Sequence, residues 1–285
     1  MKPTVYIIGG SGFIGKHLSA HLSETLNVSV FDKYIDNQFF LKYPAIKTFR
    51  LDLINETIPV EIATPDFIIN LASIVTAERD MRLFESMISS NIKILLNLYE
   101  RFCHESSLKL FMQFGSSEEY GNITAPFKET DREQPNSPYA LIKQLTTNLA
   151  LMLYQNFGFP ASVIRPGNLY GPGQNQKKFI PYVEAQLKNN APLEVSPCEQ
   201  RRDFIHISDF VSIIEKLLRN YKRCVGEIIN VSSGKSTSLK EIIEGIKTKY
   251  HSTSVVKYGA FPYRENEIMN HLCDISKLHS IIKNG

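Results

Sequence analysis

The chain has 285 residues, of which 43% are hydrophobic and 21% are charged, and it contains 15 glycines and 14 prolines. This composition is typical of a globular protein with a sizeable core, and it excludes disordered chains, collagen-like chains and small disulfide-stapled folds. The 32 lysines and arginines and the 29 aspartates and glutamates leave a formal net charge of +3. A charge so close to zero predicts no nucleic-acid partner and no membrane partner.

The cysteines predict neither a metal site nor a redox pair. They stand far apart and form no C-x-x-C motif, so we expect four reduced thiols: Cys103, Cys198, Cys224 and Cys273. The first apolar segment is too short for the core of a signal peptide, and no later apolar run is long enough to cross a membrane. These features predict a cytoplasmic protein.

Short β-rich segments alternate with helical patterns from the first residues to about residue 165. The near-continuous apolar segments predict strands buried on both faces, at 5–8, 28–31, 46–51, 67–71, 108–114 and 161–164. Apolar residues at helical spacing occur between them, at 14–26, 87–99 and 140–157. The alternation predicts an α/β fold with a Rossmann-type, doubly wound parallel sheet.

The alternation breaks down after Arg165-Pro-Gly167, where a Gly-Pro-Gly turn, a short helical pattern at 179–187 and irregular sequence follow. From 204 to 231 a helix-then-strand pattern returns. We therefore expect a dinucleotide-binding domain of residues 1–165 plus about 204–232. The remaining residues, about 166–203 plus 233–285, are expected to form a smaller C-terminal substrate-binding lobe.

Glycines at positions 9, 12 and 15 follow the first predicted strand, and Phe13 and Ile14 lie among them where the first predicted helix begins. Glycine allows a tight turn and a close approach of backbone N–H groups to a phosphate at a helix N-terminus. The spacing of Gly9, Gly12 and Gly15 therefore predicts a site for the pyrophosphate of a dinucleotide.

Acidic residues end the next two predicted strands. Asp32 stands about twenty residues beyond the glycines, where a carboxylate can bind both hydroxyls of an adenosine ribose. The negative charge of Asp32 would repel a 2′-phosphate, which favours NAD(H) over NADP(H). The preference is mild, because the adjacent Lys33 could bind such a phosphate. Asp52 and Leu53 are expected to contact the adenine, although Asp52 could equally be a solvated loop residue.

Tyr139 and Lys143 are four residues apart on a predicted helix, so their side chains lie on one face. Ser116 or Ser117 ends the strand before this helix. An ammonium beside a phenol is expected to lower the phenol pKa, so that Tyr139 can exchange a proton with a substrate oxygen near neutral pH. The serine hydroxyl would hydrogen-bond the same oxygen.

The chain resembles the extended short-chain dehydrogenases/reductases, in their nucleotide-sugar epimerase, dehydratase and reductase branch. The resemblance spans nearly the whole chain. The motifs that carry it are Gly9-Gly-Ser-Gly-Phe-Ile-Gly15, Asp52-Leu53, Asn70-Leu-Ala-Ser73, Gly115-Ser-Ser-Glu-Glu-Tyr-Gly121, Tyr139-Ala-Leu-Ile-Lys143, Arg165-Pro-Gly-Asn-Leu-Tyr-Gly-Pro172, Arg202-Asp-Phe-Ile-His206 and Arg264-Glu-Asn-Glu267.

The resemblance implies roles for individual residues. Ser116 would be the catalytic hydroxyl, Tyr139 the acid/base, and Lys143 the residue that binds the nicotinamide ribose and tunes Tyr139. Leu71 and Ala72 would contact the cofactor. A nucleotide-diphosphate sugar would be bound by a larger set, namely Ser117, Glu118, Asn168, Lys178, Phe179, Arg202 and Arg264. Asn70 stands where many relatives have histidine.

Three reactions share these catalytic residues. At the three positions where this chain has Ser116-Ser117-Glu118, many 4,6-dehydratases have a sequence similar to Thr-Asp-Glu. Some GDP-sugar dehydratases, however, also have serine at the second of these positions. The chain is most similar to compact reductases that make CDP-abequose, CDP-paratose or GDP-6-deoxysugars. This favours an NAD(P)H-dependent 4-ketoreductase of surface-polysaccharide deoxysugars. A 4,6-dehydratase or a 4-epimerase is the alternative, and a regulatory NAD(P)-binding protein without turnover is a remote one.

The apolar helical patterns at 87–99 and 140–157 are broad. After covering the sheet they should retain an exposed apolar face, which predicts a homodimer formed through a four-helix bundle.

Overall fold

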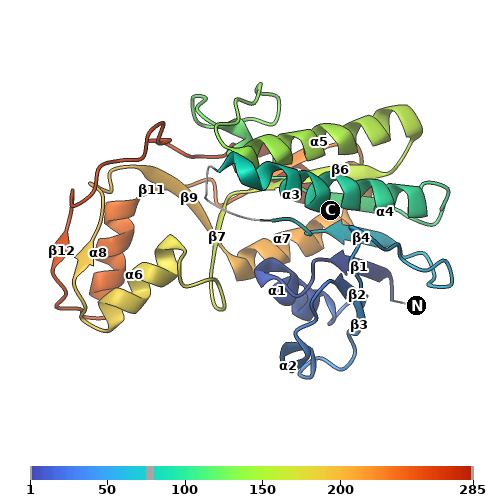
Figure 1. The fold of residues 1–285 in the computed structure, drawn as a ribbon, viewed down its shortest axis with the longest axis horizontal. Helices are drawn as coiled ribbons and strands as arrows, with labels where there is room; N and C mark the ends of the chain where they lie inside the picture. Colours follow the sequence, from blue (N-terminus) through green and yellow to red (C-terminus); the bar gives the residue numbers. More distant parts are fainter. Residues whose placement is uncertain (1, 75–79, 284–285) are drawn as a thin grey trace.

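The computed structural model describes residues 2–74 and 80–283, and in this part of the chain seven parallel strands form one central sheet (Figure 1). In chain order the strands are β1 (Thr4–Ile8), β2 (Asn27–Asp32), β3 (Lys47–Arg50), β4 (Phe67–Asn70), β5 (Leu110–Phe114), β6 (Ala161–Pro166) and β10 (Ile228–Val231). In space they run β3, β2, β1, β4, β5, β6, β10. The prediction of a doubly wound Rossmann-type sheet is confirmed.

The direction of winding reverses between β1 and β4. From β1 the chain adds β2 and β3 on one side, and it then crosses to place β4 on the other side of β1. Ile8 and Asn70, the last residues of β1 and β4, are register partners. Such a switch point leaves a crevice beyond the carboxyl ends of the strands, where open α/β sheets bind their ligands.

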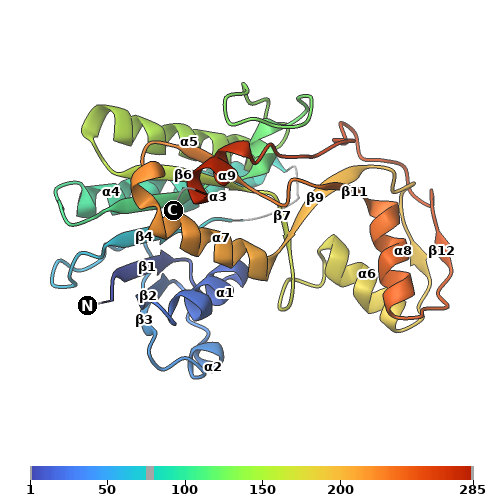
Figure 2. The ribbon, with the colours of Figure 1, turned by 180° about the vertical axis from the view of Figure 1, so that it is seen from behind.

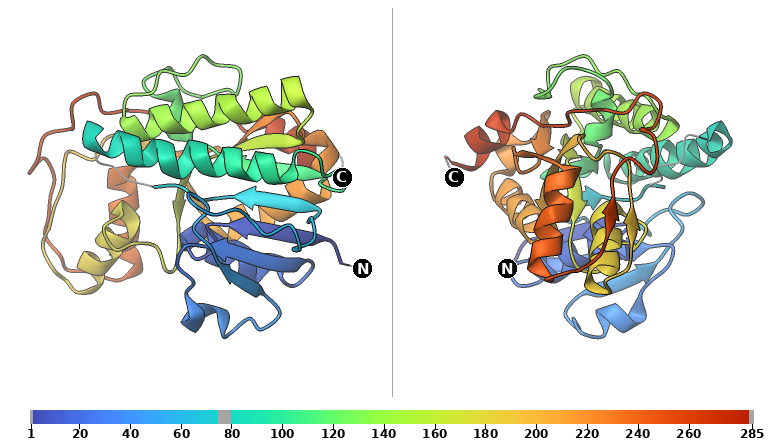
Figure 3. Two further views of the ribbon diagram at one scale, coloured as in Figure 1. Left: turned by 45° about the vertical axis from the view of Figure 1, so that its right-hand side comes forward. Right: turned by 90° about the vertical axis from the view of Figure 1, so that its left-hand side faces the viewer.

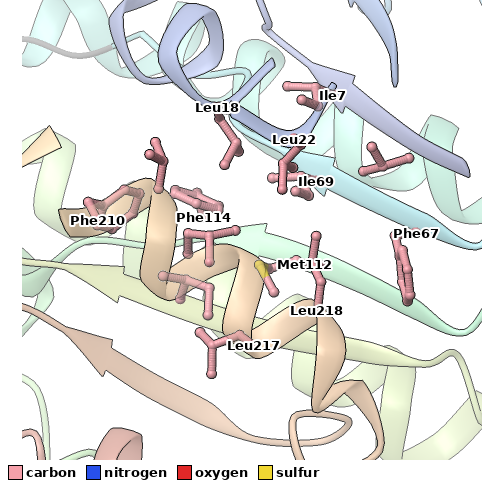
Figure 4. Packing of buried hydrophobic residues seen from close by; sticks show 14 of the residues in the cluster. Ile7, Leu18, Leu22, Phe67, Ile69, Met112, Phe114, Phe210, Leu217 and Leu218 are labelled. Carbon is pink, nitrogen blue, oxygen red and sulfur yellow. The ribbon is translucent and has the colours of Figure 1, made fainter. Parts of the chain in front are cut away.

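Helices cover both faces of the sheet (Figures 1 and 2). One face carries α1 (Phe13–Leu22), α7 (Ile207–Arg219) and α9 (Ser276–Ile282), and the other carries α4 (Ile94–Phe102) and α5 (Pro138–Phe157). Figure 4 shows side chains of α1 and α7, such as Leu18 and Leu217, packed towards strand side chains such as Met112. With both faces covered by helices, the carboxyl ends of the strands are the place where open α/β sheets bind ligands.

The helical layer beside α5 is built from consecutive pieces. A 3-10 turn (Met81–Leu83), α3 (Phe84–Ile88) and a π-helical turn (Ser89–Lys93) lead directly into α4. Figure 3 shows this run and α5 side by side over the sheet. The remaining short helical elements are α2 (Asn37–Phe40) and the 3-10 turns Ser117–Tyr120 and Tyr221–Arg223. Within 2–74 and 80–283, no helix is both long and apolar enough to span a bilayer.

Strand β3 departs from the expectation that the strands are buried on both faces. Lys47, Thr48 and Arg50 are exposed, and only Phe49 turns inwards, where it stacks on Phe31 with ring centroids 4.7 Å apart. The physical reason is that β3 lies at the edge of the sheet with a single neighbouring strand, so its outer side faces water and tolerates charge.

A smaller lobe lies on the side of the sheet away from the N-terminus (Figure 1). Its described elements are the strands β7 (Asn168–Tyr170), β9 (Arg201–His206) and β11 (Ser236–Ser238) of one sheet, the paired strands β8 (Leu193–Glu194) and β12 (Val256–Lys257), and the helices α6 (Phe179–Lys188) and α8 (Leu239–Lys249). Apolar residues of α6, β8 and α8 form its own core. β9 runs directly into α7, which joins the lobe to the central sheet.

The C-terminal segment does not stay in the lobe throughout, as the expected division at 233–285 would require. Helix α9 returns to the central sheet, where Leu278 and Ile281 are buried in the same core as α7 and β10. The apolar side of α9 covers the β10 end of the sheet, and this burial accounts for the departure.

Leu217→Ala should reduce the free energy of unfolding by about 2–5 kcal/mol, because Leu217 is completely buried and its truncation leaves a cavity. Leu41→Ala is the matched control, since Leu41 is 80% exposed, and it should change stability by less than about 0.5 kcal/mol. Urea unfolding measures both. Equal losses would contradict the assignment of α7 to the core.

Candidate functional site

A glycine turn follows β1 at the switch point, and packing explains most of its glycines. Gly9 has a φ of +78°, and a Cβ there would lie 2.9 Å from the backbone nitrogen of Ala72. A Cβ on Gly10 would lie 2.6 Å from Val30, and a Cβ on Gly15 would lie 2.5 Å from the Cα of Gly10. The turn is therefore pressed against β2, the segment after β4, and its own helix α1.

Gly12 differs from these glycines. Its φ is −71°, and a Cβ would meet only the carbonyl oxygen of Gly9, at an ordinary 3.5 Å. Gly12 begins α1, whose first turn has no side-chain cap and no acidic residue. The contacts of the chain itself do not require glycine here. A small residue beside uncapped N–H groups, which include those of Phe13 and Ile14, is a cradle that fits a phosphate group.

Asp32 lies at the end of β2, beside this cradle. Its carboxylate accepts hydrogen bonds from the N–H of Ser11, at 2.9 Å, and from the N–H of Tyr34, at 3.1 Å. Lys33 points elsewhere, since its Nζ lies 3.3 Å from the carboxylate of Asp52. Burial raises the pKa of Asp52, but hydrogen bonds from the Ile54 N–H and from Lys33 outweigh it and hold the pKa below its usual range.

The other residues expected at the cofactor lie on both sides of the switch point. Leu53 is buried in the core between the sheet and α4, so it lies deeper than Asp52. Leu71 and Ala72 follow β4 and are half-buried. Asn70 accepts a hydrogen bond from the N–H of Ala72, at 3.2 Å, and donates one to Gln113, at 2.8 Å. These bonds fix the segment against which Gly9 packs.

Ser116, Tyr139 and Lys143 come together at the end of β5. Ser116 caps the 3-10 turn Ser117–Tyr120, and its side chain is near enough to Tyr139 to lower the pKa of the phenol. Lys143, one turn further along α5, is buried and donates from Nζ to the carbonyl oxygen of Phe114 at 2.8 Å. Its Nζ lies 5.9 Å from the centroid of the Tyr139 ring. Of the two strand-end serines, Ser116 is the one whose side chain acts on Tyr139.

The expectation that the pKa of Tyr139 is lowered towards neutral pH is wrong for this chain, because the net shift is upwards. Burial raises the pKa of Tyr139, the side chain of Ser116 lowers it, and the charges of Glu118 and Glu119 raise it further. Burial also lowers the pKa of Lys143 to about 8, against the opposing charge of Glu119. Both residues are taken out of water, and the loss of hydration is the largest cause of each shift.

Beneath the serine lies a buried charge network that sequence reasoning missed. Glu119 accepts the N–H of Ser116 at 2.7 Å and the Nε of Arg165 at 2.9 Å, and Arg165 also bonds to Glu133. A sequence signal existed, because Arg165 directly follows the apolar residues of β6 and a charge in that position needs a partner.

The candidate substrate arginines lie in the lobe. Arg202 donates to the carboxylate of Glu267 and to the carbonyl oxygen of Ile268, so it is already engaged. Burial lowers the pKa of Arg202, the charges of Glu267 and Glu118 oppose this, and the charge of Arg264 adds to the lowering. Arg202 and Arg264 therefore share one neighbourhood with Glu118.

Asn168 lies on β7 beside a residue that sequence reasoning also missed. Its Nδ2 lies 3.5 Å from the carbonyl oxygen of Asp203 and 3.5 Å from the Nδ1 of His271. His271 is buried, and burial together with the charge of Arg202 lowers its pKa to about 4. His271 is therefore neutral at neutral pH.

Of the other predicted substrate residues, Ser117 and Phe179 pack against the protein, and Lys178 is exposed. Ser117 is buried, and its side chain lies near the thiol of Cys273, whose pKa is raised chiefly by burial. Phe179 packs into the lobe core, stacked 6.5 Å from Phe204 between ring centroids. Lys178 is exposed at the start of α6.

A cavity of about 680 Å³ opens elsewhere, between the lobe helices α6 and α8 and the sheet helices α7 and α9. Phe204, Ile246 and Leu278 are among the residues that line it. Neither the catalytic candidates nor the glycine turn contribute to it, so we place the site by its chemistry rather than by this cavity.

A family model described as the NAD dependent epimerase/dehydratase family matches residues 5–232. The match covers most of the chain, and the chain belongs to this family. The resemblance found in the sequence is thereby confirmed.

Individual relatives carry different names. CDP-abequose synthase from Salmonella muenchen is 40% identical over 106 residues, 37% of this chain and 36% of that protein. UDP-N-acetyl-alpha-D-glucosaminuronate decarboxylase from Bacillus cytotoxicus is 27% identical, covering 98% of this chain and 91% of that protein. dTDP-4-dehydro-6-deoxyglucose reductase from Escherichia coli is 26% identical, covering 90% and 85%.

The fold is that of a solved structure, UDP-glucuronic acid 4-epimerase from Bacillus cereus in complex with UDP-glucuronic acid and NAD. Its TM-score is 0.90 at 23% identity, over 99% of this chain and 93% of that chain. Because these proteins differ in name, membership of the family leaves the reaction to be argued from the site.

Gly12→Ala should reduce the free energy of unfolding by less than about 1 kcal/mol, because its Cβ meets no close contact. Gly15→Ala should reduce it by about 1–3 kcal/mol, since its Cβ collides with the backbone of Gly10. Thermal and urea unfolding check the pair. A larger loss for Gly12→Ala would contradict the open cradle.

Proposed function

We propose that the protein reduces the C4 keto group of a nucleotide-diphosphate 4-keto-6-deoxysugar, with NADH or NADPH, in deoxysugar biosynthesis. The observation that carries this proposal is the gathering of three side chains at the end of β5: Ser116 adjoins Tyr139, and the Lys143 ammonium lies 5.9 Å from the centroid of the Tyr139 ring. Such a set of groups suits proton transfer to a carbonyl oxygen. The relatives named as CDP-abequose synthase and as a 4-dehydro-6-deoxyglucose reductase support the choice.

Each catalytic side chain then has a distinct task. A nicotinamide cofactor held by the turn around Gly12, Asp32 and Lys143 would provide the hydride chemistry at C4 of the sugar. Tyr139 keeps its proton at neutral pH, because burial raises its pKa, and donates this proton to the C4 oxygen. Ser116 donates a hydrogen bond to the same oxygen and stabilises its developing negative charge. Lys143 binds the nicotinamide ribose and stabilises the phenolate that remains after proton transfer.

The cofactor site fits NADH better than NADPH. Asp32 would bind the ribose hydroxyls, and its charge would repel a 2′-phosphate. Lys33 is paired with Asp52, which reduces its ability to bind that phosphate. The turn around Gly12 would hold the pyrophosphate.

The substrate would lie between the sheet and the lobe. Arg202 and Arg264 would bind its diphosphate as planar donors, and Asn168 would hydrogen-bond it. Exposed Lys178 would contact the nucleotide, with the half-buried ring of Phe179 behind it.

The residue after the catalytic serine supports reduction over dehydration. Ser117 is a buried neutral hydroxyl, so it cannot serve as the acid that many dehydratases have at this position. A 4-epimerase is the second candidate. Glu118 supports it, because its charge acts on Tyr139 and on Arg202, and an acidic group beside the reacting centre could hold a rotated sugar.

Purified protein should oxidise one NADH for each NDP-4-keto-6-deoxysugar that it converts, with no turnover unless reductant is added.

Tyr139→Phe should lower kcat by about 10²–10⁴ and leave cofactor affinity close to wild type, because it removes the proton donor and keeps the ring. Tyr154→Phe, on the same helix, is the control and should keep full activity. The rate at which the reduced-nicotinamide absorbance falls measures turnover by the wild type, Tyr139→Phe and Tyr154→Phe.

A different result would identify the alternatives. Turnover of an unmodified NDP-hexose without added reductant would contradict the reductase, with loss of water indicating a dehydratase and inversion at C4 indicating a 4-epimerase. Binding of NADH with no turnover of any such sugar would indicate a regulatory protein.

We also propose a homodimer through the helices beside the sheet. Large apolar side chains of α3, α4 and α5 remain 36% to 42% exposed, namely Ile88, Leu96, Leu145 and Met152. Two copies of this face would form a four-helix bundle.

Sedimentation at micromolar concentration should show a species of twice the 32.4 kDa chain mass. Leu145→Lys should shift it towards the single-chain mass, because a charge would enter the bundle, whereas Leu41→Lys, at the residue that follows α2, should not. A wild-type protein found only at 32.4 kDa would exclude the dimer.

A further inference from the structure

We propose that Glu119 is a positioning residue: it holds the catalytic serine turn against α5 and β6, and its carboxylate is the negative charge that faces Lys143. The proposal rests on the proposed function in so far as Ser116, Tyr139 and Lys143 form the reacting set. Glu119 itself does not contact substrate or cofactor in this account, because its side chain is completely buried.

The contact with the serine is made by the backbone. Oε1 of Glu119 accepts the N–H of Ser116 at 2.7 Å, and the hydroxyl of Ser116 accepts the N–H of Glu118 at 3.2 Å, which closes a capping box around the 3-10 turn. Gly115 makes room for the carboxylate, because a Cβ there would lie 2.3 Å from Oε1. The position of the Ser116 hydroxyl therefore depends on the Glu119 carboxylate.

A fully buried arginine holds the other oxygen of Glu119. Arg165, at the end of β6, approaches Oε2 with Nε at 2.9 Å and with its terminal nitrogen at 2.8 Å. The same guanidinium lies over the ring of Tyr120, at 4.6 Å, and bonds to Glu133 in the loop before α5. Three segments that carry or flank the reacting groups are joined through this one cation.

The charges around Lys143 come from these elements. Burial lowers the pKa of Lys143 to about 8, and Glu119 opposes this. Tyr139 faces Glu118 and Glu119, while Arg165 and Glu133 lie behind Glu119. Burial raises the pKa of Glu119, and the adjacent Arg165 favours its ionised form. With Glu119 ionised, Lys143 keeps its ammonium at neutral pH, where the proposed reduction needs it.

The test compares Glu119→Gln with Glu133→Gln. Both remove one carboxylate from Arg165, but only Glu119 acts on Lys143 and Tyr139. NMR of protein labelled with 13C at the lysine Cε, assigned with Lys143→Met, follows the pKa of Lys143 without any turnover. We expect this pKa to fall by about 1 in Glu119→Gln and to stay within about 0.3 of wild type in Glu133→Gln.

Turnover gives a second readout. Activity should fall as pH rises through the Lys143 pKa, and this alkaline limit of kcat/KM should move to lower pH in Glu119→Gln by the same amount. The proposal would be overturned if Glu119→Gln left both the Lys143 pKa and the alkaline limit of kcat/KM unchanged. If every variant and the wild type lack turnover while the Lys143 pKa still falls, the proposed reduction fails and the role of Glu119 stands.

Glu119→Asp keeps the proposal falsifiable if Glu119→Gln does not fold. The shorter carboxylate retains the charge but withdraws from the N–H of Ser116, so kcat should fall at least about 10-fold with KM for NADH nearly unchanged. Wild-type kcat in Glu119→Asp would contradict the positioning role.

Discussion

Helices cover both faces of the parallel sheet, and this burial constrains where chemistry can occur. A polar side chain within the layers would lose its hydration, so the polar groups gather beyond the carboxyl ends of the strands. A charged side chain that is fully buried, such as Arg165, forms ion pairs with its neighbours, in this case Glu119 and Glu133. The site is thus a consequence of the layering, and its electrostatics are those of groups removed from water.

That desolvation changes what Tyr139 and Lys143 can do as the proposed catalytic pair. A phenol whose pKa is raised and an ammonium whose pKa is lowered to about 8 are both closer to their neutral forms than in water. For a reductase this is a useful ground state, because Tyr139 must begin as a proton donor. The net charge beside the reacting groups then depends on the protonation of Lys143 and on the Glu119 carboxylate, whose charge acts on it.

Much of this could be predicted from the sequence, because it depends on local patterns. Apolar runs located the strands, and spacing located the glycine turn and the pair Tyr139 and Lys143. The exposed edge strand β3 and the return of α9 could not be predicted, since both depend on which elements are neighbours in space. The pairing of Glu119 with Arg165 needs β5 beside β6, and the pKa of Tyr139 depends on burial that no spacing reveals.

The central claim is that hydride passes from a nicotinamide to C4 of the sugar while Tyr139 supplies the proton. Transfer of isotope tests it most directly. With NADH carrying deuterium at the reactive nicotinamide carbon, an NDP-4-keto-6-deoxysugar should yield a product with one deuterium at C4, observed by NMR and mass spectrometry. A product without deuterium at C4, or with deuterium taken there from heavy water, would contradict the account.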